Sequence, residues 1–250
     1  MSKKQNTQKN AKKKKKPMSD GMKAVIIISA AVVVMATILV VALCLPGDEI
    51  LTMPQGLVNM DTVKSEINSH KTTDFTETSS KTEYVKISVK DHGDIIIRLR
   101  PDIAPETVKN FQNLVADGFY DGLTFHRIYK NFMIQGGDPK GDGTGDSGKE
   151  IKGEFSANGV TNNLKHVRGV ISMARGNEMD SASCQFFICD ATSAHLDGKY
   201  ASFGYVMAGM DTVDSIAAVE VQANKSGEKS DPIKDVIIEK IVFVKDNHNH

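Results

Sequence analysis

Apolar and polar positions divide the chain into three parts. Residues 24–45 are apolar except for Ser29 and Thr37, and the run has no polar face. Residues 46–82 are mostly polar, and serine and threonine dominate their second half. Over residues 83–246, short apolar or alternating runs recur between turns rich in glycine and aspartate. This pattern predicts one membrane-length helix, a linker and a single folded domain.

The apolar run has the length and flanking charges of a membrane anchor. As a helix, its 22 residues reach about 33 Å at about 1.5 Å per residue, enough to cross a hydrocarbon core of roughly 30 Å. Lys12–Lys16 and Lys23 precede it, and Asp48 and Glu49 follow it. We therefore expect a basic cytoplasmic tail (residues 1–23), a single-pass transmembrane helix in the cell membrane and an extracytoplasmic domain. Lipidation, or secretion after cleavage of a signal peptide, is the main alternative, and a soluble helix a minor one.

Residues 46–82 predict a flexible Ser/Thr-rich linker, because a segment of this composition cannot bury a core of its own. The last residues, 247–250, are polar and predict a disordered tail. A short piece docked just outside the membrane is an alternative for part of the linker, built on its scattered apolar residues Ile50, Leu51, Leu57, Val58 and Met60.

The domain over residues 83–246 is predicted to be all-β, as an antiparallel barrel or sandwich. Eight runs have the length and composition of strands: 84–89, 95–99, 125–129, 132–135, 170–174, 186–189, 203–207 and 236–244.

Two stretches of the domain predict helices. One begins with Pro105 at its first position and ends before Gly118, and the other starts with Asp211 as its N-cap. Both are expected to cover the ends of a barrel. Their apolar faces consist of Val108, Phe111, Leu114 and Val115 in the first, and of Val213, Ile216 and Ala217 in the second.

The formal net charge of zero hides two charged parts. Residues 1–23 hold nine lysines and one acid, for a net +8, whereas residues 24–250 hold 22 bases and 30 acids, for a net −8. The acidic main part excludes a basic nucleic-acid-binding protein. The three cysteines lack metal-ligand spacing, and the glycine-rich stretch 136–159 lacks the Lys-Ser/Thr of a phosphate loop. We expect neither a metal nor another cofactor.

Residues 125–138 carry unusual polar side chains for a pair of strands. With period 2 along each strand, Arg127 shares a face with Phe125, and Gln135 with Met133. In residues 183–189, Gln185 likewise alternates with phenylalanines. On these residues alone, a core strand with an incidental arginine is the simpler interpretation.

Five motifs in order (FHR, FMIQGGD, SMAR, QFFI and HLDGKYASFG) change this interpretation. Together they resemble the cyclophilin family of peptidyl-prolyl cis-trans isomerases, over roughly residues 84–244. The resemblance implies a closed eight-stranded antiparallel barrel capped by two α-helices.

The resemblance also implies roles for individual residues. Arg127 matches the catalytic arginine of the family. His195 stands where many eukaryotic members have tryptophan, which implies weak or no cyclosporin binding. The loop 175–179 resembles bacterial members, which implies a closer relation to them. His126 matches a pocket-lining histidine, and Tyr200 falls where the family often has histidine. The other implied substrate-binding residues are Phe132, Met133, Phe187 and Leu196, which hold proline, His195, and Gln135, Ala174 and Gln185, which hold the substrate backbone.

The chain is thus expected to isomerise X–Pro bonds by stabilising the twisted amide, and so to accelerate folding of secreted or membrane-surface proteins. Its partners would be unfolded or partly folded Pro-containing polypeptides. No proton transfer is needed, so His126 is expected to pack rather than to act as a base. A chaperone module that binds Pro-containing peptides without catalysis is the alternative.

Overall fold

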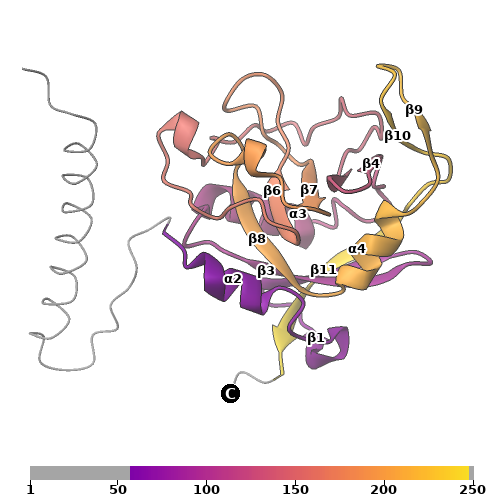
Figure 1. Ribbon diagram of the computed structural model, residues 1–250. Coiled ribbons are helices and arrows are strands. Elements are labelled where there is room, and N and C mark those ends of the chain that lie inside the picture. Colours follow the sequence, from indigo (N-terminus) through magenta and orange to yellow (C-terminus); the bar gives the residue numbers. More distant parts are fainter. Residues whose placement is uncertain (1–56, 248–250) are drawn as a thin grey trace, which may run out of the picture. The chain divides into compact units, whose positions relative to one another are not determined.

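A computed structural model describes residues 57–247 of the chain (Figure 1). The described part is mostly β, with three α-helices and three short 3₁₀ turns. The helices are α2 (Met60–Glu66), α3 (Pro105–Ala116) and α4 (Met210–Ala217). The strands are β1 (Phe75–Glu77), β2 (Tyr84–Val89), β3 (Gly93–Leu99), β4 (Arg127–Tyr129), β5 (Met133–Gly136), β6 (Val170–Met173), β7 (Phe186–Cys189), β8 (Ser202–Ala208), β9 (Val221–Ala223), β10 (Lys229–Pro232) and β11 (Ile238–Asp246).

Nine strands form one antiparallel sheet in the order β1-β11-β2-β3-β8-β6-β7-β5-β4, and β9 and β10 form a separate hairpin. Each of the eight predicted strands overlaps a strand of this sheet. The inner face of the sheet is filled by aromatic and branched side chains from most strands. Phe111 of α3 packs into this core, and the centroid of its ring lies 5.6 Å from that of Phe186 and 5.2 Å from that of Phe203.

The predicted closed eight-stranded barrel is wrong in strand number and in closure. Within residues 57–247, no ladder joins the two edge strands β1 and β4. The chain just before β4 instead meets the chain just before β11 through a single bridge, Thr124 with Ile237. Backbone hydrogen bonds from Phe125 to Val236 (2.9 Å) and from Ile238 to Leu123 (2.7 Å) flank this bridge. Here the two segments cross too briefly to form a strand pair.

Both predicted helices are present, and both bury their apolar faces in the main core. Helix α3 starts at Pro105 as expected, packs against β11 and buries Phe111 completely. Helix α4 begins one residue before the predicted N-cap Asp211, and its N-cap is Gly209. Gly209 has φ of 91°, and a Cβ there would lie 2.2 Å from the carbonyl oxygen of Asp94. The close approach of β3 therefore sets the start of this helix.

A third helix lies in the segment predicted to be a flexible linker. Asn59 caps α2 by accepting hydrogen bonds from the backbone N–H groups of Asp61 (2.9 Å) and Thr62 (3.3 Å). Val63 is fully buried against side chains of β3, β6 and β8, on the side of the sheet away from the main core. Glu66 binds the guanidinium of Arg98 at 2.8 Å and accepts a hydrogen bond from the Tyr205 hydroxyl.

Strand β1 extends this attachment by pairing with the end of β11, near the C-terminus in Figure 1. Over residues 57–77 the linker prediction is therefore wrong. A few well-placed side chains suffice to dock a segment whose average composition is that of a tether. At the other end, Asn247 also belongs to the folded part, because its backbone N–H donates to the carbonyl oxygen of Asp74 at 3.0 Å.

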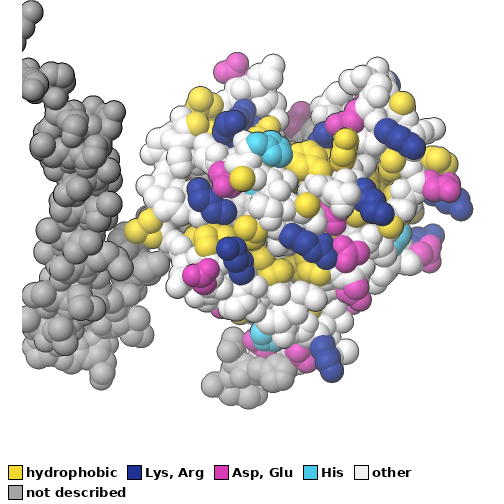
Figure 2. All heavy atoms as spheres, viewed as in Figure 1, with side chains coloured by type: hydrophobic (Ala, Val, Ile, Leu, Met, Phe, Trp, Pro, Cys, Tyr) yellow, Lys and Arg dark blue, Asp and Glu magenta, His cyan; other side chains and the backbone are white. Residues whose placement is uncertain are grey.

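No helix within residues 57–247 is long and apolar enough to cross a membrane. The predicted tail (1–23), the predicted span (24–45), the first part of the predicted linker and residues 248–250 lie outside the described residues. On the face drawn in Figure 2, acidic and basic side chains are interspersed, so this face carries no extended region of one charge.

Candidate active site

The β4–β5 hairpin places the key polar side chains beside an apolar strand. Arg127 lies opposite Gln135 across this hairpin, and Gln135 lies opposite Phe187 on β7. Residues directly opposite on antiparallel strands point to the same face. The turn is set by Asn131, which has φ of 62° and whose backbone N–H donates to the Asp190 carboxylate at 2.6 Å. Register alone therefore assembles a guanidinium, a carboxamide and a phenyl ring in one row.

These side chains border a small pocket with a cavity volume of about 150 Å³. This is well below the range of about 300 to 1,000 Å³ that is typical for drug-sized ligands, and suits a single ring-sized group. Met133, Phe187 and Leu196 are nearly fully buried and form its apolar surface. The complete lining is Arg127, Phe132, Met133, Gln135, Ala174, Arg175, Phe187, Leu196 and Tyr200.

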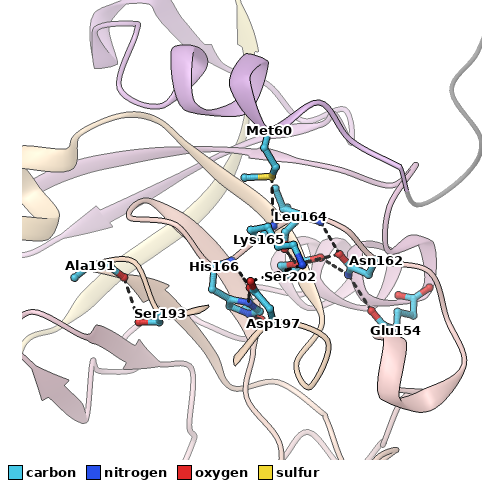
Figure 3. Close-up of polar contacts among 11 residues, drawn as sticks. Met60, Glu154, Asn162, Leu164, Lys165, His166, Ala191, Ser193, Asp197 and Ser202 are labelled. Carbon is cyan, nitrogen blue, oxygen red and sulfur yellow. Dashed lines mark hydrogen bonds and ion pairs between the residues drawn. The ribbon is translucent and has the colours of Figure 1, made fainter. Parts of the chain in front are cut away.

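A buried histidine, His166, packs against the pocket residue Phe187. The ring of His166 stacks on that of Phe187 with centroids 6.0 Å apart. Its Nδ1 lies 3.0 Å from the Asp197 carboxylate (Figure 3). Its Nε2 lies 3.0 Å from the Ser172 hydroxyl. Burial lowers the pKa of His166, so the ring is neutral, donating to Asp197 and accepting from Ser172. This arrangement fixes the plane of Phe187.

Arg127 is held on two sides. Its Nε donates to Oε2 of Glu228 at 2.6 Å, and its Nη2 donates to Oε1 of the same carboxylate at 2.7 Å. Its Nη1 donates to the side-chain oxygen of Gln135 at 3.3 Å. Gln135 in turn donates to Gln185 at 2.9 Å, and Gln185 donates to the carbonyl oxygen of Gly145 at 2.8 Å. One hydrogen-bonded row thus runs from Glu228 to the loop around Gly145.

The structure brings most of the predicted site residues together. Gln185 joins the pocket through its bond to Gln135, and exposed His195 lies at the rim, 5.4 Å from the ring of Phe132. His126 does not line the pocket; it lies in a neighbouring cavity of about 410 Å³ on the other side of Arg127. Both of its ring nitrogens are buried without a hydrogen-bond partner, and burial lowers its pKa. The other eight predicted residues line the pocket directly: Arg127, Phe132, Met133, Gln135, Ala174, Phe187, Leu196 and Tyr200.

Two residues of the site were not among the predicted ones. Arg175 lies over the rings of Tyr200 (4.9 Å) and Phe155 (5.2 Å), and its Nε donates to the carbonyl oxygen of Lys199. It therefore fixes Tyr200 at the edge of the pocket. Glu228 is 101 residues from Arg127 in the sequence and belongs to no motif. Only the fold brings it to the site.

No group of three or more histidine, cysteine or carboxylate side chains within residues 57–247 is placed to hold a metal ion. The side chains around the pocket supply a fixed guanidinium, two carboxamides and an apolar surface.

Comparisons with known proteins identify the family of the chain. A family model described as cyclophilin type peptidyl-prolyl cis-trans isomerase/CLD matches residues 84–242. Peptidyl-prolyl cis-trans isomerase-like 1 of Rhizopus delemar is 46% identical over 133 residues, which are 53% of this chain and 79% of that protein. The protein of the same name in Gibberella zeae is 40% identical over 155 residues, 62% of this chain and 91% of that protein.

A solved structure shows the same fold. It is a cyclophilin-type peptidyl-prolyl cis-trans isomerase of Cryptosporidium parvum, crystallised in the presence of the dipeptide Ala-Pro. The TM-score is 0.56 at 33% identity, over 64% of this chain and 98% of that one. All three relatives are eukaryotic, so the closer relation to bacterial members stays a prediction. The chain belongs to the cyclophilin-type peptidyl-prolyl cis-trans isomerases.

Proposed function

We propose that the pocket binds the proline of an X–Pro segment and that Arg127 is the catalytic residue for its cis-trans isomerisation. The barrier to rotation is about 18 to 20 kcal/mol, because resonance gives the C–N bond double-bond character. The observation that carries the proposal is a guanidinium held at the rim of a ring-sized apolar pocket.

Catalysis requires the enzyme to bind the twisted amide better than the planar one. The pyrrolidine ring stays in the apolar pocket, clamped against Met133, Phe187 and Leu196, while the carbonyl side of the bond rotates. In the twisted state the prolyl nitrogen loses its conjugation and becomes a hydrogen-bond acceptor. An N–H group of Arg127 donates to that lone pair, and this bond has no counterpart in the planar ground state.

The remaining residues hold the substrate around the rotating bond. Gln135, Ala174 and Gln185 bind backbone groups on either side of the proline. His195 and Tyr200 border the entrance, and His126 packs behind Arg127 without transferring a proton. Weak or no cyclosporin binding is proposed, because the exposed His195 offers less apolar surface than the tryptophan of many eukaryotic members.

We further propose that the domain acts outside the cytoplasm on secreted or membrane-surface polypeptides, anchored through residues 24–45. The support lies in the sequence, namely the length of the apolar run and the lysines before it. Protease treatment of intact cells or spheroplasts tests this location. Protection of the domain from external protease would contradict it, and release of the domain without its first 45 residues would favour cleavage.

A protease-free prolyl-isomerisation assay on the full chain in detergent tests the activity. We expect wild type to accelerate the reaction. Arg127→Ala should lose about 100-fold in kcat/KM, comparable to the loss when other enzymes lose one hydrogen-bond donor to the transition state. Arg127→Lys is the matched control, since it keeps the charge but loses the planar fork. If wild type binds a Pro-containing peptide without accelerating its isomerisation, the chain is a binding module instead.

A further inference from the structure

A glutamate from a distant hairpin occupies one whole edge of the Arg127 guanidinium. The β9–β10 hairpin lies against β4 (Figure 1), and Glu228 stands in its turn, just before β10. Both oxygens of the carboxylate accept from Arg127, at 2.6 and 2.7 Å. The two side chains are about one third exposed, so the pair is partly shielded from water. A two-bond pair of this kind fixes orientation as well as distance.

The carboxylate is itself held in place. The Ser230 hydroxyl donates to Glu228 Oε2 at 2.8 Å. The backbone N–H of Glu228 donates to the side-chain oxygen of Asn224 at 3.0 Å, and the backbone N–H of Asn224 donates to the Glu228 carbonyl oxygen at 2.8 Å. Gly227 has φ of 83°, which lets the turn close. Glu228 is thus a fixed acceptor rather than a freely moving surface side chain.

The pair determines which N–H groups of Arg127 remain for a substrate. A guanidinium has five N–H groups in one plane. Glu228 accepts hydrogen bonds from the N–H on Nε and from one N–H on Nη2, and Gln135 accepts from one N–H on Nη1. One N–H on Nη1 and one on Nη2 are left. Their direction is fixed by the three bonds already made.

We propose that Glu228 is a positioning residue, which orients the guanidinium of Arg127 so that a remaining N–H points at the twisted prolyl nitrogen. This inference rests on the proposed function. A freely moving arginine side chain would lose rotational freedom about several bonds each time it donates to the substrate. The bonds to Glu228 already restrict this rotation before the substrate binds, so less entropy is lost at the transition state.

The carboxylate also lowers the positive potential at Arg127, which acts against catalysis. This effect is the smaller one here, because the acceptor in the twisted amide is a neutral lone pair that requires a directed donor more than a net charge. The other charged or titratable groups around Glu228 are Lys225 and Lys229 on the hairpin, Asp231 on β10, and Asp142 and His126 across the neighbouring cavity. Within the described residues, only Arg127 and Ser230 make side-chain bonds to its carboxylate.

The first test compares variants of the full chain in detergent by the isomerisation assay. We expect Glu228→Ala to lose about tenfold in kcat/KM, mainly in kcat, because the contact is needed at the transition state. Glu228→Gln should lose less, because its amide oxygen can still accept one N–H. Glu220→Ala is the matched control: this exposed glutamate lies at the foot of the same hairpin and does not line the pocket. It should match wild type.

The second test measures the pH dependence of kcat/KM, which a merely structural role of Glu228 would not change. The hydrogen bond from Arg127 lowers the pKa of Glu228 below its usual value of 4.5. The pair should therefore persist above that value and break as the pH falls through the lowered pKa. We expect kcat/KM of wild type to fall in that acid range, and Glu228→Gln to show no such step.

An NMR measurement separates failure of this inference from failure of the proposed function. The Nε–H signal of Arg127 should exchange slowly with water in wild type and quickly in Glu228→Ala. If Glu228→Ala is as active as wild type or more active, Glu228 does not position Arg127 for catalysis. If wild type is inactive, the proposed function fails and the catalytic role of Glu228 with it, even where the slow Nε–H signal shows that the pair exists.

Discussion

Replacing Val63 by alanine tests whether residues 57–77 belong to the folded domain. Val63 is fully buried among Ile96, Val170 and Met207, and truncation to alanine removes two methyl groups from this contact. At about 0.8 kcal/mol for each group, the lost burial amounts to about 1.6 kcal/mol. A partly unfilled cavity raises the total to about 2 kcal/mol. A flexible linker would give a change close to zero.

Urea unfolding of a fragment over residues 53–250, which lacks the predicted span, measures the effect. We expect Val63→Ala to lower the free energy of unfolding by about 2 kcal/mol and Tm by about 4 to 8 °C. Leu57→Ala is the control on the same segment, because its side chain is 37% exposed, and it should change stability by less than about 0.5 kcal/mol. Val85→Ala in β2 reports a core truncation. If Val63→Ala matches Leu57→Ala while Val85→Ala destabilises, the docking of α2 contributes nothing and the reasoning fails.

Three further outcomes are expected for the same fragment. Burial lowers the pKa of His166 in the folded state, so the unfolded chain binds the proton first as the pH drops. The free energy of unfolding should therefore decrease as the pH falls through about 6.5. In urea titrations, His166→Gln should show a smaller difference in this free energy between pH 7.5 and pH 5.5 than wild type. Burial raises the pKa of Cys184 to about 11 and of Cys189 to about 12, so neither thiol should react with iodoacetamide at pH 8 until urea unfolds the chain, as mass spectrometry would show. Gly209→Ala should cost at least about 1 kcal/mol in urea unfolding, because φ is 91° and the new Cβ meets the backbone at Asp94; unchanged stability would contradict that geometry.

The sequence predicts strands and pocket residues where short-range geometry decides them. Alternation along 125–129 and 132–135 places Arg127 and Gln135 on related faces, and the tight turn between the strands puts the two side chains opposite each other. The helix at Pro105 follows from its first residue and its apolar stripe. In each case the structure of the element is determined by the residues of one or two neighbouring segments.

The errors arise where distant segments meet. The docking of α2 depends on Glu66 meeting Arg98 and Tyr205, which lie 32 and 139 residues away. The N-cap of α4 at Gly209 depends on the backbone of β3. Composition and periodicity average over such single contacts. A segment with many serines and threonines can therefore still be anchored by one buried valine and one ion pair.

The same limit applies to the electrostatics of the site. From the sequence, Arg127 is an isolated cation within an acidic part of the chain. In the structure the charge of Arg127 is balanced by Glu228, so the arginine presents two oriented N–H groups to the pocket more than a net positive charge. In the proposed reaction, Arg127 should therefore contribute to selection by directed hydrogen bonds rather than by attraction to acidic residues. This arrangement suits the proposed action on varied polypeptides, because proline and the peptide backbone are the features that all X–Pro segments share.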